Sequence, residues 1–247
     1  MLFKQIFLAV CGLLIISSAV YSQPQTTMQF VGGYSIPLGE MKGKFDDNRA
    51  IFTNNADSNT YFLQNGFNFG LNFSHSPFKK LMSFKILGGI NYNRFSQNKD
   101  YSSDTSPVII NYNLRIFTLS IGVEYAYLTK RSKINPFASA EFSANFYSGS
   151  LTSTFNSGTP VVSSFNPTSR YGLQLGAGID FVLGQRVGII TGVKYNMANL
   201  IGRTSLGDTQ VTYNLNDADA TIKGVKYHNR NTYYLQIYAG FSIYLGI

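Results

Sequence analysis

Few residues of this chain could carry out acid–base, metal or thiol chemistry. The 247 residues include only two histidines, His75 and His228, which are too few for a histidine metal cluster. The single cysteine, Cys11, lies in an apolar run near the N-terminus, so no disulfide or thiolate metal site is expected in the rest of the chain. We therefore predict no metal, no cofactor and no catalytic residue.

Two glutamates, Glu124 and Glu141, are the remaining candidates, because paired carboxylates can serve as general acid and base. Side chains alternate between the two faces of a β-strand. On that pattern, both glutamates share a face with Lys85 and Lys194. This arrangement favours ion pairs over catalysis. The glycine-rich stretches GGYSIPLG and LGAGID lie within the same alternating segments and do not fit a phosphate-binding loop at a helix N-terminus.

The elements that must position these residues are long alternating strands. The stretch YYLQIYAGFSIYLGI at 233–247 contains no charge and places apolar side chains on one face and small or polar ones on the other. The same pattern recurs along the chain and predicts eight strands, at about 26–37, 62–74, 81–95, 109–127, 135–147, 171–183, 186–198 and 233–247.

The connections between these strands alternate in length. Long connections at about 38–60, 96–108, 148–168 and 199–230 alternate with short ones at 76–80, 128–134 and 184–185. This rhythm is typical of an up-and-down transmembrane β-barrel with short periplasmic turns, long external loops and both termini in the periplasm. All seven prolines fall at strand ends or in connections, where the missing N–H is tolerated.

The charged residues indicate which face of the strands is outside. A soluble barrel of the lipocalin kind would point its apolar face inward and show the polar face to water. A Lys or Arg facing mid-bilayer lipid costs about 2–4 kcal/mol, so a membrane barrel keeps its strand charges on the inner face. Arg170 lies on the small or polar face, and so does Arg115 if the strand has a bulge at Ile116–Phe117, whereas Arg94 lies on the apolar face. The other strand charges share the polar face and predict a lumen ion-pair network of Lys85, Glu124, Glu141, Asp180 and Lys194.

Aromatic residues recur at the outer end of the apolar face. Membrane barrels carry girdles of amphipathic rings at the two interfaces. The sequence has no Trp, so Tyr takes most of this role. We predict an outer aromatic girdle of Tyr34, Tyr61, Tyr92, Tyr112, Phe146, Tyr171, Tyr195 and Tyr233.

The N-terminal segment MLFKQIFLAVCGLLIISSAVYSQ has a basic residue, a short apolar run and small residues before a plausible cleavage site after Ser22. These features are typical of a secretory signal peptide, so we expect a signal at 1–22 and a barrel domain at 23–247. Charged residues make up 13% of the chain, against about a quarter in average soluble domains. The formal charge of +8 is scattered, which argues against nucleic acid as a partner.

The alternating strands from TTMQFVGGYSIPLGEM (26–41) to QIYAGFSIYLGI (236–247) resemble the eight-stranded outer-membrane β-barrel families, namely the OmpA-like transmembrane domain and the PorT-like barrels. The chain departs from many such barrels by ending in Ile247 rather than Phe. The resemblance implies an outer membrane of the Gram-negative type, lipid and lipopolysaccharide as surroundings, and assembly by the barrel-assembly machinery. A monomer is expected, because the last strand closes against the first.

Three functional hypotheses remain open on the sequence alone. The favoured one is a non-enzymatic barrel with a side-chain-filled lumen, whose long external loops bind an unknown extracellular ligand or support envelope integrity. The alternative is a narrow pore or a secretion or assembly accessory, as the PorT-like resemblance implies. A lipid A-modifying enzyme, with His228 as a base, is disfavoured because the spacing fixes no partner for that histidine.

Overall fold

The computed structural model describes residues 25–43, 61, 63–77, 83–101, 108–127, 133–155, 158–164, 166–204, 217–222, 225–227 and 229–245. Most of these residues belong to β-strands, and a short 3-10 turn, η1 (Gly39–Met41), follows the first strand. No helix among the described residues is long and apolar enough to cross a membrane. The predicted signal peptide and His228 lie outside the described residues.

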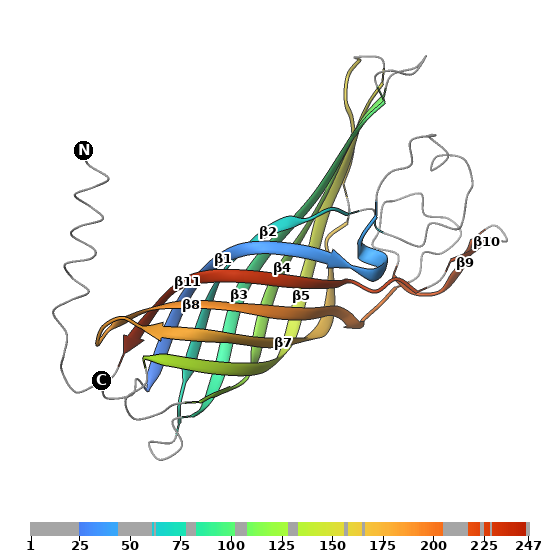
Figure 1. The fold of residues 1–247 in the computed structure, drawn as a ribbon. Coiled ribbons are helices and arrows are strands. Elements are labelled where there is room, and N and C mark those ends of the chain that lie inside the picture. The colour runs from blue at the N-terminus through green and yellow to red at the C-terminus, as the bar shows by residue number, and fades with distance from the viewer. Residues whose placement is uncertain are drawn as a thin grey trace, which may run out of the picture.

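Eight long antiparallel strands close into a barrel (Figure 1). They are β1 (Thr26–Leu38), β2 (Gly66–His75), β3 (Phe84–Asp100), β4 (Val108–Ala126), β5 (Ile134–Phe155), β7 (Thr168–Val182), β8 (Val187–Ile201) and β11 (Tyr233–Leu245). Each strand pairs with the next, and β1 pairs with β11 from Thr26↔Leu245 to Leu38↔Tyr233. The predicted eight-stranded up-and-down barrel is confirmed.

The strands are staggered as barrel closure requires. A walk along partner residues from Lys85 passes through all eight strands and returns to β3 at Phe95, ten residues further on. Such a stagger tilts the strands against the barrel axis and sets the width of the lumen. An eight-stranded barrel has an interior that side chains alone can fill.

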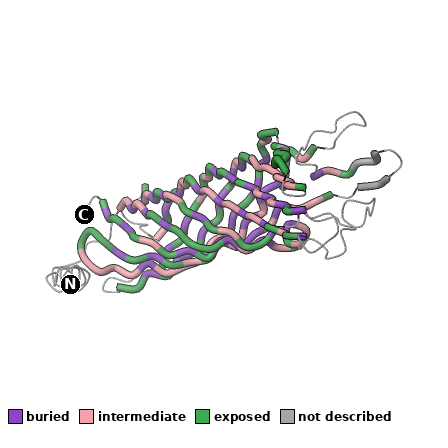
Figure 2. Tube along the Cα trace, turned by 90° about the horizontal axis from the view of Figure 1, so that it is seen from above, coloured by how far each residue is buried: buried purple, intermediate pink, exposed green. Residues whose placement is uncertain are grey.

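The outward face of the barrel is apolar over most of its height. Side chains alternate between more and less buried along most of the length of the eight barrel strands, which Figure 2 shows as alternating bands. No Lys, Arg, Asp or Glu stands on the outward face of the described strands below the level of Arg94 and Arg115. Exposed apolar residues from each strand form this outward apolar band, for example Phe30, Phe69, Ile90, Ile121, Phe142, Leu175, Val193 and Phe241.

The polarity of the two faces inverts near the outer end of β3, β4 and β5. Below the inversion, β4 points Phe117 outward and Thr118 inward; above it, Arg115 points outward and Ile116 inward. Pairing between β3 and β4 runs without a register shift through this region. The expected bulge at Ile116–Phe117 was therefore wrong, and Arg115 lies on the outward face opposite Arg94. The change of phase in the sequence marks a change in what surrounds the strand.

Two strands extend well beyond their predicted outer ends. β3 ends at Asp100 rather than near residue 95, and β5 ends at Phe155 rather than near residue 147, whereas β4 matches its predicted range. β3, β4 and β5 continue beyond the other strands as a projecting sheet, joined by β6 (Val161–Ser164) along Ser150–Ser153 of β5 (Figure 1). Parts of the expected connections 96–108 and 148–168 are thus paired strand. The last long connection, predicted at about 199–230, carries a small hairpin of β9 (Ala220–Ile222) with β10 (Val225–Tyr227).

Candidate functional site: the barrel lumen and its outer mouth

The lower lumen, toward the short turns, contains two buried ion pairs. Lys85 Nζ lies 3.3 Å from Glu124 Oε1, on directly paired positions of β3 and β4. Lys194 Nζ lies 2.8 Å from Glu141 Oε1, although β7 separates their two strands. Lys194 reaches across β7 beside Gly176, where an added Cβ would lie 2.5 Å from Ser139 Oγ. The structure thus brings four of the five predicted network residues together as two pairs.

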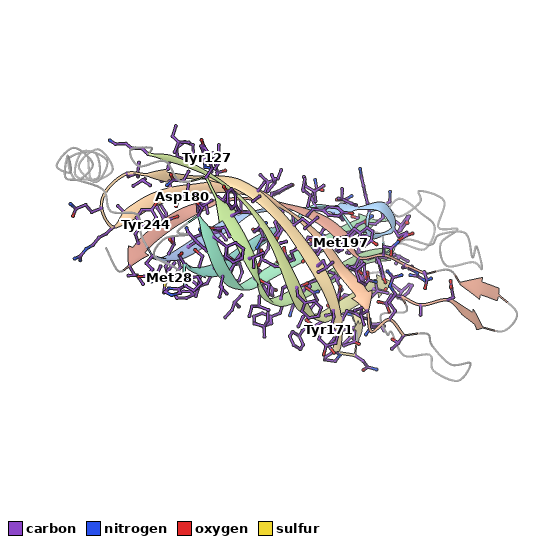
Figure 3. The ribbon with its side chains drawn as sticks, turned by 90° about the horizontal axis from the view of Figure 1, so that it is seen from below. Met28, Tyr127, Tyr171, Asp180, Met197 and Tyr244 are labelled. Atoms are coloured by element: carbon purple, nitrogen blue, oxygen red, sulfur yellow. The ribbon has the colours of Figure 1, made fainter. Side chains whose placement is uncertain are left out.

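Asp180, the fifth residue of the predicted network, is held by hydroxyl groups. Its Oδ1 accepts hydrogen bonds from Ser242 Oγ at 3.0 Å and from the Tyr244 hydroxyl at 2.9 Å. Figure 3 shows Asp180 beside Tyr244 at the end of the barrel that carries the short turns. Asp180 also lines a cavity with Lys85 and Glu124. That cavity has about 10 Å³ available to water centres, which is room for about one water molecule.

Aromatic rings fill the lower lumen by lying over inward glycines. A Cβ at Gly192 would lie 2.6 Å from the Tyr238 hydroxyl oxygen, and one at Gly188 would collide with the Tyr244 hydroxyl. Both tyrosines are buried. The small residues of the polar face therefore leave space that the tyrosine rings occupy.

A layer of amide side chains occupies the middle of the lumen. The side-chain oxygen of Asn93 accepts hydrogen bonds from Ser35 at 2.8 Å and from Gln236 at 2.7 Å. Asn196 donates to Gln236 at 3.1 Å, and Asn68 donates to Ser35 at 3.2 Å. These groups come from five different strands, so the network ties opposite walls of the barrel together.

Above the amide layer the lumen becomes apolar. Phe95 and Tyr234 are fully buried and meet edge to face with ring centroids 5.3 Å apart. Met41 and Leu63 enter from the first long connection, whose two ends are joined by a hydrogen bond from Leu63 N to Met41 O of 3.1 Å. We call this group the upper cluster, and it consists of Met41, Tyr61, Leu63, Phe95, Tyr112, Leu114, Ile116, Tyr147, Ala198 and Tyr234.

A buried ion pair between Arg170 and Asp217 closes the outer mouth. Arg170 donates through Nε to Asp217 Oδ2 at 2.8 Å and through Nη2 to Oδ1 at 2.9 Å, a bidentate pair. Asn199 and the backbone N–H of Thr204 donate to the same carboxylate, each at 3.0 Å. Asp217 is fully buried although it belongs to the last long connection, so this carboxylate anchors that connection into the barrel.

The first and last long connections meet over the mouth. The guanidinium of Arg230 lies 5.4 Å from the centre of the Tyr61 ring, and burial raises the pKa of the Tyr61 hydroxyl. The backbone N–H of Asn231 donates to the carboxylate of Glu40 in η1. Arg203 donates to Asn231 at 2.7 Å. These contacts and the Arg170–Asp217 pair form what we call the mouth cap.

Six of the eight predicted girdle residues lie on the outward face: Tyr34, Tyr92, Phe146, Tyr171, Tyr195 and Tyr233. Tyr195 and Tyr233 are neighbours, with ring centroids 6.1 Å apart. Assigning Tyr61 and Tyr112 to the girdle was wrong, because their side chains are buried in the upper cluster at 5% and 8% exposure. Both belong to the level where the inward face has become apolar, so strand parity alone assigned them to the wrong side.

The charged side chains of the lumen and the Arg170–Asp217 pair at the mouth are engaged in ion pairs and hydrogen bonds. No group of three or more His, Cys, Asp or Glu side chains in the described part of the chain could hold a metal ion. His75, at the short-turn end of β2, shares a 2.8 Å hydrogen bond with the Thr26 hydroxyl. Strand alternation predicts Arg170 on the polar face, whereas no sequence pattern indicates Asp217, which lies in a connection without periodicity.

Removing one partner of the Lys85–Glu124 pair should destabilise the barrel. Lys85→Ala leaves a buried carboxylate uncompensated, a loss of about 3–5 kcal/mol in unfolding free energy. The double change Lys85→Ala with Glu124→Ala should cost less than the single one. Urea titration of the folded barrel in lipid measures both, with the exposed Lys133→Ala as control. Additive effects would contradict a coupled pair.

Neutralising Asp217 should open the mouth cap while leaving the barrel folded. Asp217→Asn preserves side-chain size but leaves the buried guanidinium of Arg170 without its counter-charge, at a local cost of about 3–5 kcal/mol. Trypsin should then cut between residues 202 and 232 faster than in the parent protein. Asp219→Asn is the matched control, since Asp219 is exposed and bonds only within the same connection to Asn229. Equal resistance of both variants would show that the Arg170–Asp217 pair does not hold the cap.

Several solved structures are similar to this chain. No protein-family model matches the sequence, and no curated protein matches it. Similar solved structures include Neisserial surface protein A, with 12% identity, a TM-score of 0.49 and coverage of 90% of this chain and 97% of that one. Another is Ail, the attachment invasion locus protein of Yersinia pestis, solved with the heparin analogue sucrose octasulfate, with 12% identity, a TM-score of 0.40 and coverage of 88% and 99%. A third is the N-terminal β-barrel domain of Pseudomonas aeruginosa OprF, with 8% identity, a TM-score of 0.36 and coverage of 90% and 99%. The unbroken circle of strand pairing, rather than these likenesses, establishes the chain as a closed eight-stranded antiparallel barrel.

Proposed function

We propose that this protein is a non-enzymatic β-barrel of the outer membrane in a Gram-negative-type envelope. Its lumen is filled by its own side chains, and its outer end serves surface binding or envelope integrity. The observation that carries the proposal is the polarity of the barrel: apolar outside, polar and packed inside. A soluble barrel has the opposite arrangement.

The outward apolar band supports insertion into lipid. Soluble monomers rarely expose contiguous apolar patches larger than a few hundred Å². Here Phe241 is 67% exposed, Ile121 64% and Phe69 55%, and the apolar surface continues around all eight strands. The outward aromatic residues at the upper end of the band suit the headgroup level of a bilayer. Tyr127 is 61% exposed at the short-turn end and suits the opposite interface (Figure 3).

The packing of the interior supports a structural or binding role over transport. Ion pairs with tyrosine rings, then the amide layer, then the upper cluster succeed one another along the lumen, and the mouth cap lies at its outer end. The cavity beside Lys85 and Glu124 has room for about one water molecule. A continuous water path for ions would require these layers to separate.

The pairing of the strands supports a monomer with both termini in the periplasm. Closure of β1 on β11 leaves no free edge within the barrel itself, so a monomer is self-sufficient there. Strand ends Thr26 and Leu245 lie with the short turns, which places the termini in the periplasm if the long connections face outward. On this proposal the partners are outer-membrane lipid and lipopolysaccharide, the barrel-assembly machinery and an extracellular ligand of unknown identity.

Single cysteines should report insertion directly. In a Cys11→Ser background reconstituted in phosphatidylcholine vesicles, Phe241→Cys should react slowly with a water-soluble maleimide because lipid covers it. Asn98→Cys, exposed on the projecting sheet, should react quickly. Both should react alike after unfolding in urea. Equal rates in the folded, reconstituted protein would rule out a membrane-embedded band.

Conductance should separate the filled barrel from the narrow pore. The parent protein in planar bilayers should pass little or no steady current, because the charged, amide and apolar layers leave no open path. An insertion control is needed, and protection of Phe241→Cys in the same bilayer lipid supplies it. Steady, open conductance of the inserted parent protein would favour the pore and remove the filled lumen from the proposal.

A further inference from the structure

Two arginines stand directly opposite each other on the outward face of the barrel. Arg94 of β3 and Arg115 of β4 are register partners, both on the face that turns away from the lumen. Arg115 is exposed, and Arg94 is half-buried and donates to Asn113 Oδ1 at 3.1 Å. Like charges directly opposite on a sheet are destabilising. An anion placed between the two guanidinium groups would reverse that effect.

The surroundings of the two arginines supply no such anion from the described part of the chain. On the outward face at the same level, the row continues to Phe67 on one side and Ser148 on the other. The described acidic residue that shares this face of β3 is Asp100, six residues further along the strand, which corresponds to roughly 20 Å. The pair is therefore positioned for an anion that comes from outside the chain.

The level directly below the arginines is aromatic. Tyr92, Phe117 and Phe146 are consecutive register partners across β3, β4 and β5, two residues closer to the middle of the barrel. The Phe117 and Phe146 rings are 6.2 Å apart, and Tyr92 lies 5.0 Å from the ring of Phe69. Two residues of strand correspond to about 7 Å. An anion at the arginines would thus lie immediately above a surface suited to acyl chains.

The level directly above the arginines is polar and uncharged. Ser96, Asn113 and Ser150 are register partners on the same outward face, followed two residues further by Asn98, Asn111 and Thr152. Amide and hydroxyl side chains can both donate and accept hydrogen bonds. Such a surface matches the hydroxyl groups of a sugar.

We propose that the outward face of β3, β4 and β5 binds a phosphorylated glycolipid of the outer leaflet. Its acyl chains would lie on the aromatic level, one phosphate between Arg94 and Arg115, and its sugars against the Asn and Ser side chains of the projecting sheet. Arginine suits this position because its planar guanidinium forms bidentate hydrogen bonds to phosphate. The inference rests on the proposed membrane location and adds a lipid-binding site to it.

Equilibrium binding to the detergent-solubilised, folded full-length protein tests the site. Native mass spectrometry would follow titration with bisphosphorylated lipid A, with the same lipid A after removal of both phosphates, and with phosphatidylglycerol. The parent protein should bind the bisphosphorylated form most tightly. In Arg94→Gln with Arg115→Gln, that affinity should fall about tenfold or more, because two charge-assisted contacts are lost.

Arg186→Gln is the matched control, because it removes one positive charge from the exposed short-turn end of the barrel. It should bind bisphosphorylated lipid A as the parent protein does. The proposal is overturned if the double variant binds that lipid unchanged, if Arg186→Gln loses as much affinity, or if phosphatidylglycerol binds the parent protein as tightly. Slow maleimide labelling of Phe241→Cys in the double-variant background would show that insertion is intact, so a failed site is distinguishable from a failed membrane assignment.

Discussion

The pairing of β1 with β11 is the contact on which the rest of the structure depends. It joins two segments about two hundred residues apart, from Thr26↔Leu245 to Leu38↔Tyr233, and turns an open sheet into a closed one. A strand edge exposed to lipid would leave backbone N–H and C=O groups without partners, each at a cost of several kcal/mol. Closure removes that cost and creates two separate environments, one on each face of every strand.

The charged groups that closure buries in the lumen must then find partners there. Lys85 with Glu124 and Lys194 with Glu141 pair their charges, and Asp180 receives hydroxyl groups instead. Buried ion pairs of this kind contribute little net stability over an apolar core, but losing one partner is costly. Glycines on the inner face give the tyrosine rings their space, so small and large residues complement each other across strands.

Near the outer end of the barrel, the outward face of β3, β4 and β5 becomes polar and the inward face becomes apolar. Once the outward face meets water or headgroups, Arg94 and Arg115 can stand on it, and the inward face can be apolar because connections cover it. Met41 and Leu63 belong to the first long connection and Asp217 to the last. Segments outside the barrel strands therefore contribute to both the upper cluster and the mouth cap. The projecting sheet of β3 to β6 is the continuation of this inverted region.

The sequence by itself determined the barrel. Period-two alternation identified eight strands, the lengths of connections identified their direction, and the placement of Lys85 and Glu124 on neighbouring strands made them an expected pair. These features are local or depend only on the order of the strands, so they can be recognised from the sequence alone. The sequence also determined that Lys194, Glu141 and Asp180 face the lumen, because parity within each strand decides that.

Only the tertiary structure decided which of these groups meet and where the environment changes. Lys194 pairs with Glu141 across β7, and the stagger between strands that brings them level is not a sequence pattern. The phase change at Ile116–Phe117 resembled a bulge in the sequence, but the strand continues without a register shift while its outward face changes from apolar to polar. Because of this change in polarity, Tyr112 faces inward and Arg115 faces outward. Tyr61, in the first long connection, is buried in the same upper cluster as Tyr112. The pairing of Asp217 with Arg170 could not be predicted from the sequence. Asp217 lies in a connection without periodicity, and the two residues meet only when that connection folds back onto the barrel.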